Sequence, residues 1–140
     1  MCSSDLVETP ARAKVLQGEK ALVFAAVAGK SLPNAEIVVL PNAAGKVDLK
    51  KMLAELAKRG VNELHVEGGF KLNGSLLREG CVDELLLYLA PCLLGDPARG
   101  IAEFRDGLAR LSDRVALTLH DVARVGTDLR VLARVVPKEI

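Results

Sequence analysis

The stretch 63–80 changes from a strand pattern to a helix pattern within a few residues. A short β-type run at 64–66 passes through Glu67 into the glycine pair Gly68 and Gly69. Three leucines then recur at helical spacing, namely Leu72, Leu76 and Leu77. The order strand, glycine turn and helix is typical of α/β proteins, and it predicts that the rest of the chain forms a frame around this turn.

The same turn predicts an anion site of phosphate size. Glycine removes the Cβ that would block close approach, and the unpaired N–H groups of the first helical turn point toward a ligand there. Glu67 would stand at the carboxyl end of its strand, where open α/β sheets hold their ligands. A plain structural turn is the alternative, because residues 68–75 match neither the dinucleotide fingerprint nor the P-loop pattern.

Hydrophobic patterns predict the remaining elements. A helix from the N-cap Asp48 to Arg59, ended by Gly60, has the clearest pattern, since its apolar residues fall on one face. Continuous apolar runs predict buried strands, and alternation near the C-terminus predicts an antiparallel hairpin. The expected strands lie at 21–27, 36–40, 63–67 and 84–90, the hairpin strands at 115–119 and 129–133, and one helical turn within 103–111.

These elements predict an α/β fold, with a mostly parallel sheet and an antiparallel edge. The run at 84–90 is apolar at nearly every position, so we expect a central strand with helices packed above and below it. A length of 140 residues fits one domain with a core of its own.

Composition argues against several classes of protein. A net charge of +1 without a basic stripe disfavours a nucleic-acid partner, and the apolar runs are too short to cross a membrane. Three cysteines without CxxC spacing indicate reduced thiols in a cytoplasm, with neither a disulfide frame nor a metal site. We assign no chemistry to His65, which we expect to be packed, or to His120, which we expect to be solvated.

One ordered series of residues resembles a known family. The series is Val66-Glu67-Gly68-Gly69, Leu72, Ser75-Leu76-Leu77, Val82-Asp83-Glu84-Leu85, Tyr88-Leu89-Ala90-Pro91 and Leu93-Leu94-Gly95. It is similar to the reductase domain of the riboflavin-biosynthesis deaminase/reductase, and Thr9-Pro10 and Leu22-Val23-Phe24 extend the similarity upstream. The resemblance covers nearly all of the chain from Val7 onward and is densest between residues 61 and 100.

The resemblance implies a dihydrofolate-reductase-like sheet with flanking helices and a C-terminal antiparallel hairpin. It also implies NADPH as the cofactor and reduction of the ribosyl sugar of 5-amino-6-(5-phosphoribosylamino)uracil to its ribityl form, in a cytoplasmic, homo-oligomeric full-length protein. Carried over by position, Glu67 would contact the substrate. The NADPH phosphates would be held by Gly68, Gly69, Phe70, Lys71, Leu72, Asn73, Gly74 and Ser75. No residue is identified as a proton donor, and no metal is implied.

The beginning of the chain departs from the family. Cys2 to Leu6 reads as the translation of a common sequencing-adapter end, so we expect residues 1–6 to be a non-native leader and 7–140 a partial reductase domain. A full domain of the resembled family begins well before Thr9-Pro10 and includes a strand between those expected at 63–67 and 84–90. A non-catalytic nucleotide-binding or assembly module is therefore the alternative to an active reductase.

Overall fold

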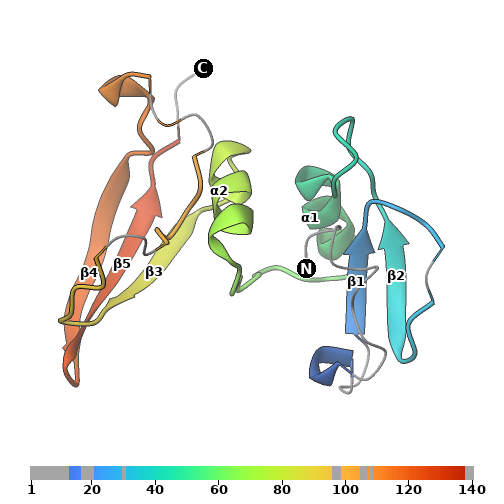
Figure 1. Cartoon of the computed structure of the whole chain (residues 1–140), viewed down its shortest axis with the longest axis horizontal. Helices are drawn as coiled ribbons and strands as arrows, with labels where there is room; N and C mark the ends of the chain where they lie inside the picture. The colour runs from blue at the N-terminus through green and yellow to red at the C-terminus, as the bar shows by residue number, and fades with distance from the viewer. Residues whose placement is uncertain are drawn as a thin grey trace. The chain divides into compact units, whose positions relative to one another are not determined.

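The computed structural model describes residues 13–16, 21–29, 31–95, 99–104, 107 and 109–137. The chain divides into two compact units, Met1–Gly68 and Gly69–Ile140 (Figure 1). The leader expected at residues 1–6 lies outside the described residues.

The first unit is built on a parallel pair of strands. β1 (Ala21–Ala25) pairs with β2 (Ala35–Val39) in a register that places Ala21 opposite Ala35. A small core of Leu16, Ala25 and Leu32 lies against this pair, and partly buried side chains from both strands pack around it. The two strands predicted in this region are therefore present, each within two residues of its expected bounds.

The helix α1 (Leu49–Lys58) has the caps that the sequence predicts. The carboxylate of Asp48 accepts a hydrogen bond from the Lys51 amide at 3.0 Å. Gly60 follows the helix with a φ of 83°, a left-handed conformation that favours glycine. Arg59 joins the helix to β2 through hydrogen bonds of 2.8 and 2.6 Å to the two carboxylate oxygens of Glu36. Capping and one bidentate ion pair thus fix the helix on its strand pair.

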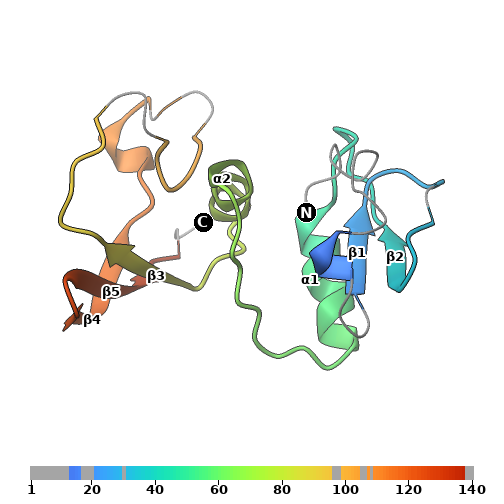
Figure 2. The ribbon, with the colours of Figure 1, turned by 60° about the horizontal axis from the view of Figure 1, so that its bottom comes forward.

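The second unit holds an antiparallel sheet. Its strands lie in the order β3 (Glu84–Leu89), β5 (Asp128–Val135) and β4 (Leu117–Val125), as Figure 2 shows. Gly126, with a φ of 61°, lies in the turn between β4 and β5. This is the C-terminal antiparallel hairpin that was predicted, and with the helices and the parallel pair it confirms the α/β fold class.

The register gives this sheet one aliphatic face and one face that mixes charged and apolar residues. On the aliphatic face Leu87 lies opposite Val131, which in turn lies opposite Val122. On the mixed face Leu86 lies opposite Leu132, and Arg134 donates a hydrogen bond of 2.9 Å to the carboxylate of Glu84 on the neighbouring strand. The alternation of the two hairpin strands is therefore resolved into two chemically different surfaces.

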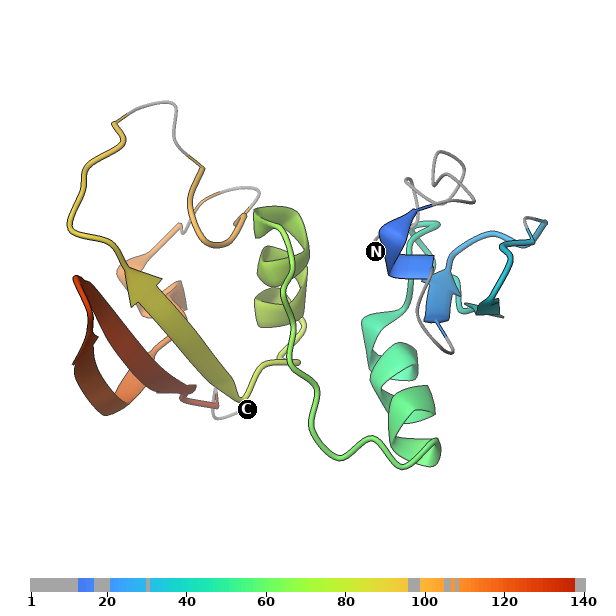
Figure 3. The ribbon, with the colours of Figure 1, turned by 90° about the horizontal axis from the view of Figure 1, so that it is seen from below.

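The strand predicted at 63–67 does not form. Residues 61–69 run from α1 to α2 as an irregular stretch (Figure 3), and the side chains of Leu64 and Val66 are 43% and 41% exposed. A β-type pattern shows that side chains suit a pleated surface, but a strand forms only when its backbone has a partner. No described strand pairs with this stretch, so the local pattern predicted an element whose pairing it could not supply.

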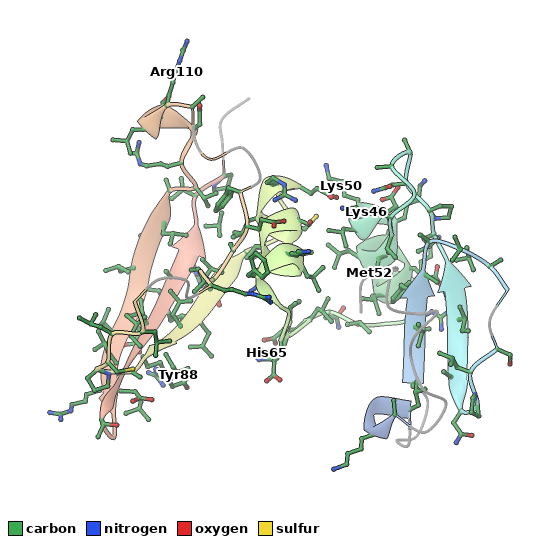
Figure 4. All side chains as sticks on the ribbon, viewed as in Figure 1. Lys46, Lys50, Met52, His65, Tyr88 and Arg110 are labelled. Atoms are coloured by element: carbon green, nitrogen blue, oxygen red, sulfur yellow. The ribbon has the colours of Figure 1, made fainter. Side chains whose placement is uncertain are left out.

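The prediction that 84–90 is a central strand is also wrong for the described sheet. β3 pairs with β5 along one edge, and no described strand pairs with its other edge. Accordingly Leu86, Tyr88 and Leu89 are 46%, 56% and 50% exposed. Figure 4 shows Tyr88 projecting from β3. An apolar run indicates a preference for burial, and here the described residues leave that preference unsatisfied.

Two smaller expectations differ from the structure. The described strands make one parallel and two antiparallel pairings, so the sheet is not mostly parallel. A short 3-10 helix forms at Leu111–Asp113 and so begins at the last residue of the range 103–111, in which one helical turn is expected.

Candidate functional site

The helix α2 (Phe70–Arg78) begins directly after the glycine pair, as predicted. Gly69 is its N-cap, with φ −75° and ψ 164°, and as a glycine it has no side chain that could cap the helix. The first N–H groups of a helix have no partner within the helix, so its N-terminal end attracts anions. A Cβ added to Gly69 would meet no heavy atom within 4 Å. The space into which a Gly69 side chain would project is therefore open.

Residues 99–104, here called the strap, lie beside α2 (Figure 3). The amide of Glu103 donates a hydrogen bond of 2.9 Å to the carbonyl of Phe70. The side-chain amide of Asn73 donates another of 2.9 Å to the carbonyl of Ile101. These contacts fix the strap on the first two turns of the helix.

The strap separates the predicted cofactor residues into two groups. Asn73 bonds to the strap, and Gly74 is buried beneath the backbone of Glu103. The hydroxyl of Ser75 donates to the carbonyl of Lys71 at 3.1 Å, inside the helix itself. The other group forms the approach to the helix and its first turn and consists of Gly68, Gly69, Phe70, Lys71 and Leu72. Of the eight predicted residues, Asn73 and Gly74 face the strap, Phe70 contacts it through its carbonyl and its ring, and Gly69 lies beside open space.

Two arginines that contact α2 and the strap are not among the predicted site residues. The guanidinium of Arg99 lies over the ring of Phe70, 5.2 Å from its centroid, in cation–π geometry. Arg78 donates through Nη1 to the carbonyl of Glu103 and through Nη2 to the hydroxyl of Ser75 at 2.9 Å. The contacts to the strap join residues far apart in the sequence, so no local pattern could have found them. Arg78 in particular looks like an ordinary basic residue of a last helical turn.

Glu67 and His65 lie in the irregular stretch before the glycine pair. The Glu67 carboxylate is 88% exposed, and its Oε1 lies 3.6 Å from Nε2 of His65, which is itself 70% exposed (Figure 4). Glu67 is therefore available to a ligand. The expectation that His65 is packed is wrong, because the strand that would have buried it does not form.

The resolved pKa shifts belong to groups that hold the first unit together. The hydrogen bond from Arg59 lowers the pKa of the Glu36 carboxyl, and Glu36 and then Glu55 raise the pKa of the Arg59 guanidinium. The bond from the Lys51 amide likewise lowers the pKa of Asp48. These groups lie at a helix cap and at a helix–strand junction, so their charges stabilise structure.

Neither a metal cluster nor a membrane-spanning helix is found in the part of the chain that the structure describes. There, no three His, Cys, Asp or Glu side chains come together in a way that could hold a metal ion. None of the described helices has the length and apolar content to span a membrane. The two described cysteines, Cys81 and Cys92, form no disulfide with each other.

Comparison with protein families decides where the chain belongs. The model of the RibD C-terminal domain matches residues 2–131. The chain is a member of the RibD C-terminal domain family. The resemblance noted in the ordered series from Val66 to Gly95 is thereby confirmed.

Individual relatives of this RibD-type chain agree with the assignment. Riboflavin biosynthesis protein RibD of Haemophilus influenzae is 43% identical over 82 residues, which are 59% of this chain and 22% of that protein. A 5-amino-6-(5-phosphoribosylamino)uracil reductase of Buchnera aphidicola is 28% identical over 95 residues, which are 68% of this chain and 44% of that protein. The chain therefore spans less than half the length of either relative.

A solved structure supports the fold. Acinetobacter baumannii RibD superposes with a TM-score of 0.79 at 24% sequence identity, over 91% of this chain and 35% of that chain. The fold of this chain is accordingly that of a RibD reductase domain, which agrees with the expected dihydrofolate-reductase-like class.

Proposed function

We propose that the protein is an NADPH-dependent reductase of riboflavin biosynthesis that acts on 5-amino-6-(5-phosphoribosylamino)uracil. The observation that carries this proposal is the open, uncapped N-terminus of α2 behind a glycine pair, in a chain of the RibD C-terminal domain family. A helix end of this kind suits the phosphates of a dinucleotide. The name of the Buchnera relative supplies the substrate class.

Binding and orientation are the chemistry proposed for this chain. When bound, NADPH would supply a hydride to C1 of the ribosyl group, and one proton completes the reduction to the ribityl product. The backbone N–H groups from Gly69 to Leu72 hold the cofactor phosphates, and the exposed Lys71 adds a positive charge to the same turn. Gly68 lets the chain enter the turn. Holding the two reactants in one geometry is the main source of rate acceleration in such a reaction.

Three of the predicted cofactor residues lie in α2 after its first turn. Asn73 bonds to the strap, Gly74 allows its close approach and Ser75 bonds within the helix, so the three support the phosphates indirectly. Glu67 serves the substrate, because its exposed carboxylate can accept hydrogen bonds from sugar hydroxyls or from a pyrimidine N–H.

The proposed activity belongs to a complete reductase domain, because this chain covers 44% of the Buchnera reductase. We infer that residues 7–140 are part of such a domain. The full-length protein is proposed to be a cytoplasmic homo-oligomer whose partner is a small phosphorylated pyrimidine, with no role for nucleic acid or a membrane.

Calorimetry and kinetics test the proposal in an extended chain, made by joining a relative's N-terminal reductase segment ahead of residue 7. The extended chain should bind NADPH and consume it, measured by absorbance, when the ribosylamino substrate is added. Replacing Gly69 with valine should weaken NADPH binding by about 2 kcal/mol, roughly thirtyfold, because the new side chain enters the space of the phosphates.

The control variant is Ala54→Val, which adds bulk to an exposed position of α1 and should leave NADPH affinity unchanged. Unchanged affinity in a folded Gly69→Val variant would show that the phosphates bind elsewhere. Failure of the extended wild-type chain to consume NADPH would contradict the proposed reaction itself.

A further inference from the structure

The far end of α2 is connected to its first turn by a chain of hydrogen bonds. Arg78, the last residue of the helix, donates to the carbonyl of Glu103 in the strap, and the amide of Glu103 donates to the carbonyl of Phe70 at 2.9 Å. The strap residue therefore bridges the last and the first residue of the helix through the two polar groups of its own backbone.

A second route runs inside the helix. The other terminal nitrogen of Arg78 donates to the hydroxyl of Ser75 at 2.9 Å, and that hydroxyl donates to the carbonyl of Lys71 at 3.1 Å. Both routes begin at one guanidinium and end on carbonyls of the first helical turn. Since a guanidinium presents several donors in a fixed planar fork, it can hold two acceptors in one geometry.

Gly74 makes this arrangement possible. A Cβ at this position would lie 2.7 Å from the amide nitrogen and 2.8 Å from the carbonyl carbon of Glu103, inside van der Waals contact. Without a Cβ, the Glu103 backbone approaches the helix closely enough to meet both Phe70 and Arg78. The close approach and the two hydrogen-bond routes thus describe one packed unit of helix and strap.

We propose that Arg78 is a positioning residue for cofactor binding, which acts on the first turn of α2 through the strap and through Ser75. With a rise of 1.5 Å per residue, Arg78 begins about 12 Å along the helix from Phe70. A phosphate at the helix N-terminus is held by the backbone N–H groups of the first turn, and Arg78 orders that turn through its carbonyls. The ligand in this inference is the dinucleotide of the proposed function, on which this part of the inference rests.

The test compares Arg78→Ala, Arg78→Lys and the control Arg110→Ala. Arg110 is exposed and its side chain projects into solvent (Figure 4). Hydrogen exchange measured by NMR follows two amides with known partners, Glu103 with the carbonyl of Phe70 and Asn73 with the carbonyl of Gly69. NADPH affinity is measured in the extended chain, together with KM and kcat.

In Arg78→Ala the exchange rates of both amides should rise over wild type by more than those of the β4–β5 hairpin. NADPH should bind roughly five- to tenfold more weakly, and KM should change more than kcat. Arg78→Lys retains one donor and should restore part of the loss. Arg110→Ala should leave both measurements unchanged.

Exchange that is unchanged at Glu103 and Asn73, or that rises equally throughout the second unit, overturns the positioning role. Faster exchange with unaltered NADPH affinity overturns the link to cofactor binding. If the wild-type extended chain does not bind NADPH, the proposed function fails, whereas the exchange rates still decide whether Arg78 orders the first turn.

Discussion

Replacing Gly74 with alanine should destabilise the second unit, even though alanine is the better helix former. In a helix interior this substitution usually gains about 0.5–1 kcal/mol. At Gly74, however, the new Cβ would collide with the amide nitrogen, carbonyl carbon and carbonyl oxygen of Glu103. All three are backbone atoms, so rotating a side chain cannot relieve the collision.

The molecule has two ways to accommodate the added methyl group. If the strap stays, overpacking costs about 1–3 kcal/mol. If the strap moves away, the Glu103–Phe70 and Asn73–Ile101 hydrogen bonds are lost, at about 0.5–1.5 kcal/mol each. Subtracting the gain in helix propensity from either cost leaves a net loss of unfolding free energy of roughly 0–2.5 kcal/mol, about 1 kcal/mol at the middle of both ranges.

Urea unfolding followed by circular dichroism measures this difference as a shift in midpoint. Gly100→Ala is the matched control, because Gly100 lies in the same strap and its added Cβ would meet only the Ala102 carbonyl oxygen, at 4.0 Å. That control should be neutral or slightly stabilising. A Gly74→Ala protein as stable as wild type would refute the close packing of strap and helix.

Other changes test the substrate site, the first unit and the open sheet edge. Glu67→Gln in the extended chain should raise the substrate KM or lower kcat with NADPH affinity near wild type; equal damage to both ligands would remove Glu67 from the substrate site. Arg59 lowers the pKa of Glu36 below its ordinary 4.5, so this pair contributes its full stability above that pH and loses it as the pH falls through the lowered pKa. Thermal unfolding should therefore show a smaller acid loss in Glu36→Gln, and an identical pH profile would contradict this reasoning. Leu86→Lys should reduce self-association by light scattering, because a charge blunts the open edge of β3; unchanged scattering would exclude that edge. The chain without an extension should show no NADPH turnover, and a rate near that of the extended chain would show that it needs no further segment.

Local patterns predicted the elements whose stabilising groups lie close by in the sequence. α1 needed only its apolar face, the Asp48 cap and Gly60, all within 13 residues of the chain. The β4–β5 hairpin needed two alternating runs and the turn at Gly126. In each case the groups that define the element are near neighbours in the sequence, so a local pattern is enough to predict it.

The two wrong strand predictions have one physical cause. The strand expected at 63–67 and the central position expected for 84–90 both depend on backbone partners far away in the chain. Hydrophobic pattern reports which side chains prefer burial, but it does not report which strand will provide a neighbouring backbone. The contact of Arg78 with the strap and that of Arg99 with Phe70 could not be predicted for the same reason, since each joins residues far apart in the sequence.

The two glycines around α2 show how far the candidate site could be foreseen. Sequence reasoning assigned Gly69 and Gly74 to the same task, close approach of a phosphate. A Cβ would meet nothing within 4 Å at Gly69, whereas at Gly74 it would meet the backbone of Glu103. The absent side chain at Gly74 is thus explained by packing within the protein. At Gly69, where φ is −75° and other residues would be tolerated, packing gives no explanation. The phosphate hypothesis therefore depends on Gly69, and that is where a substitution tests it most directly.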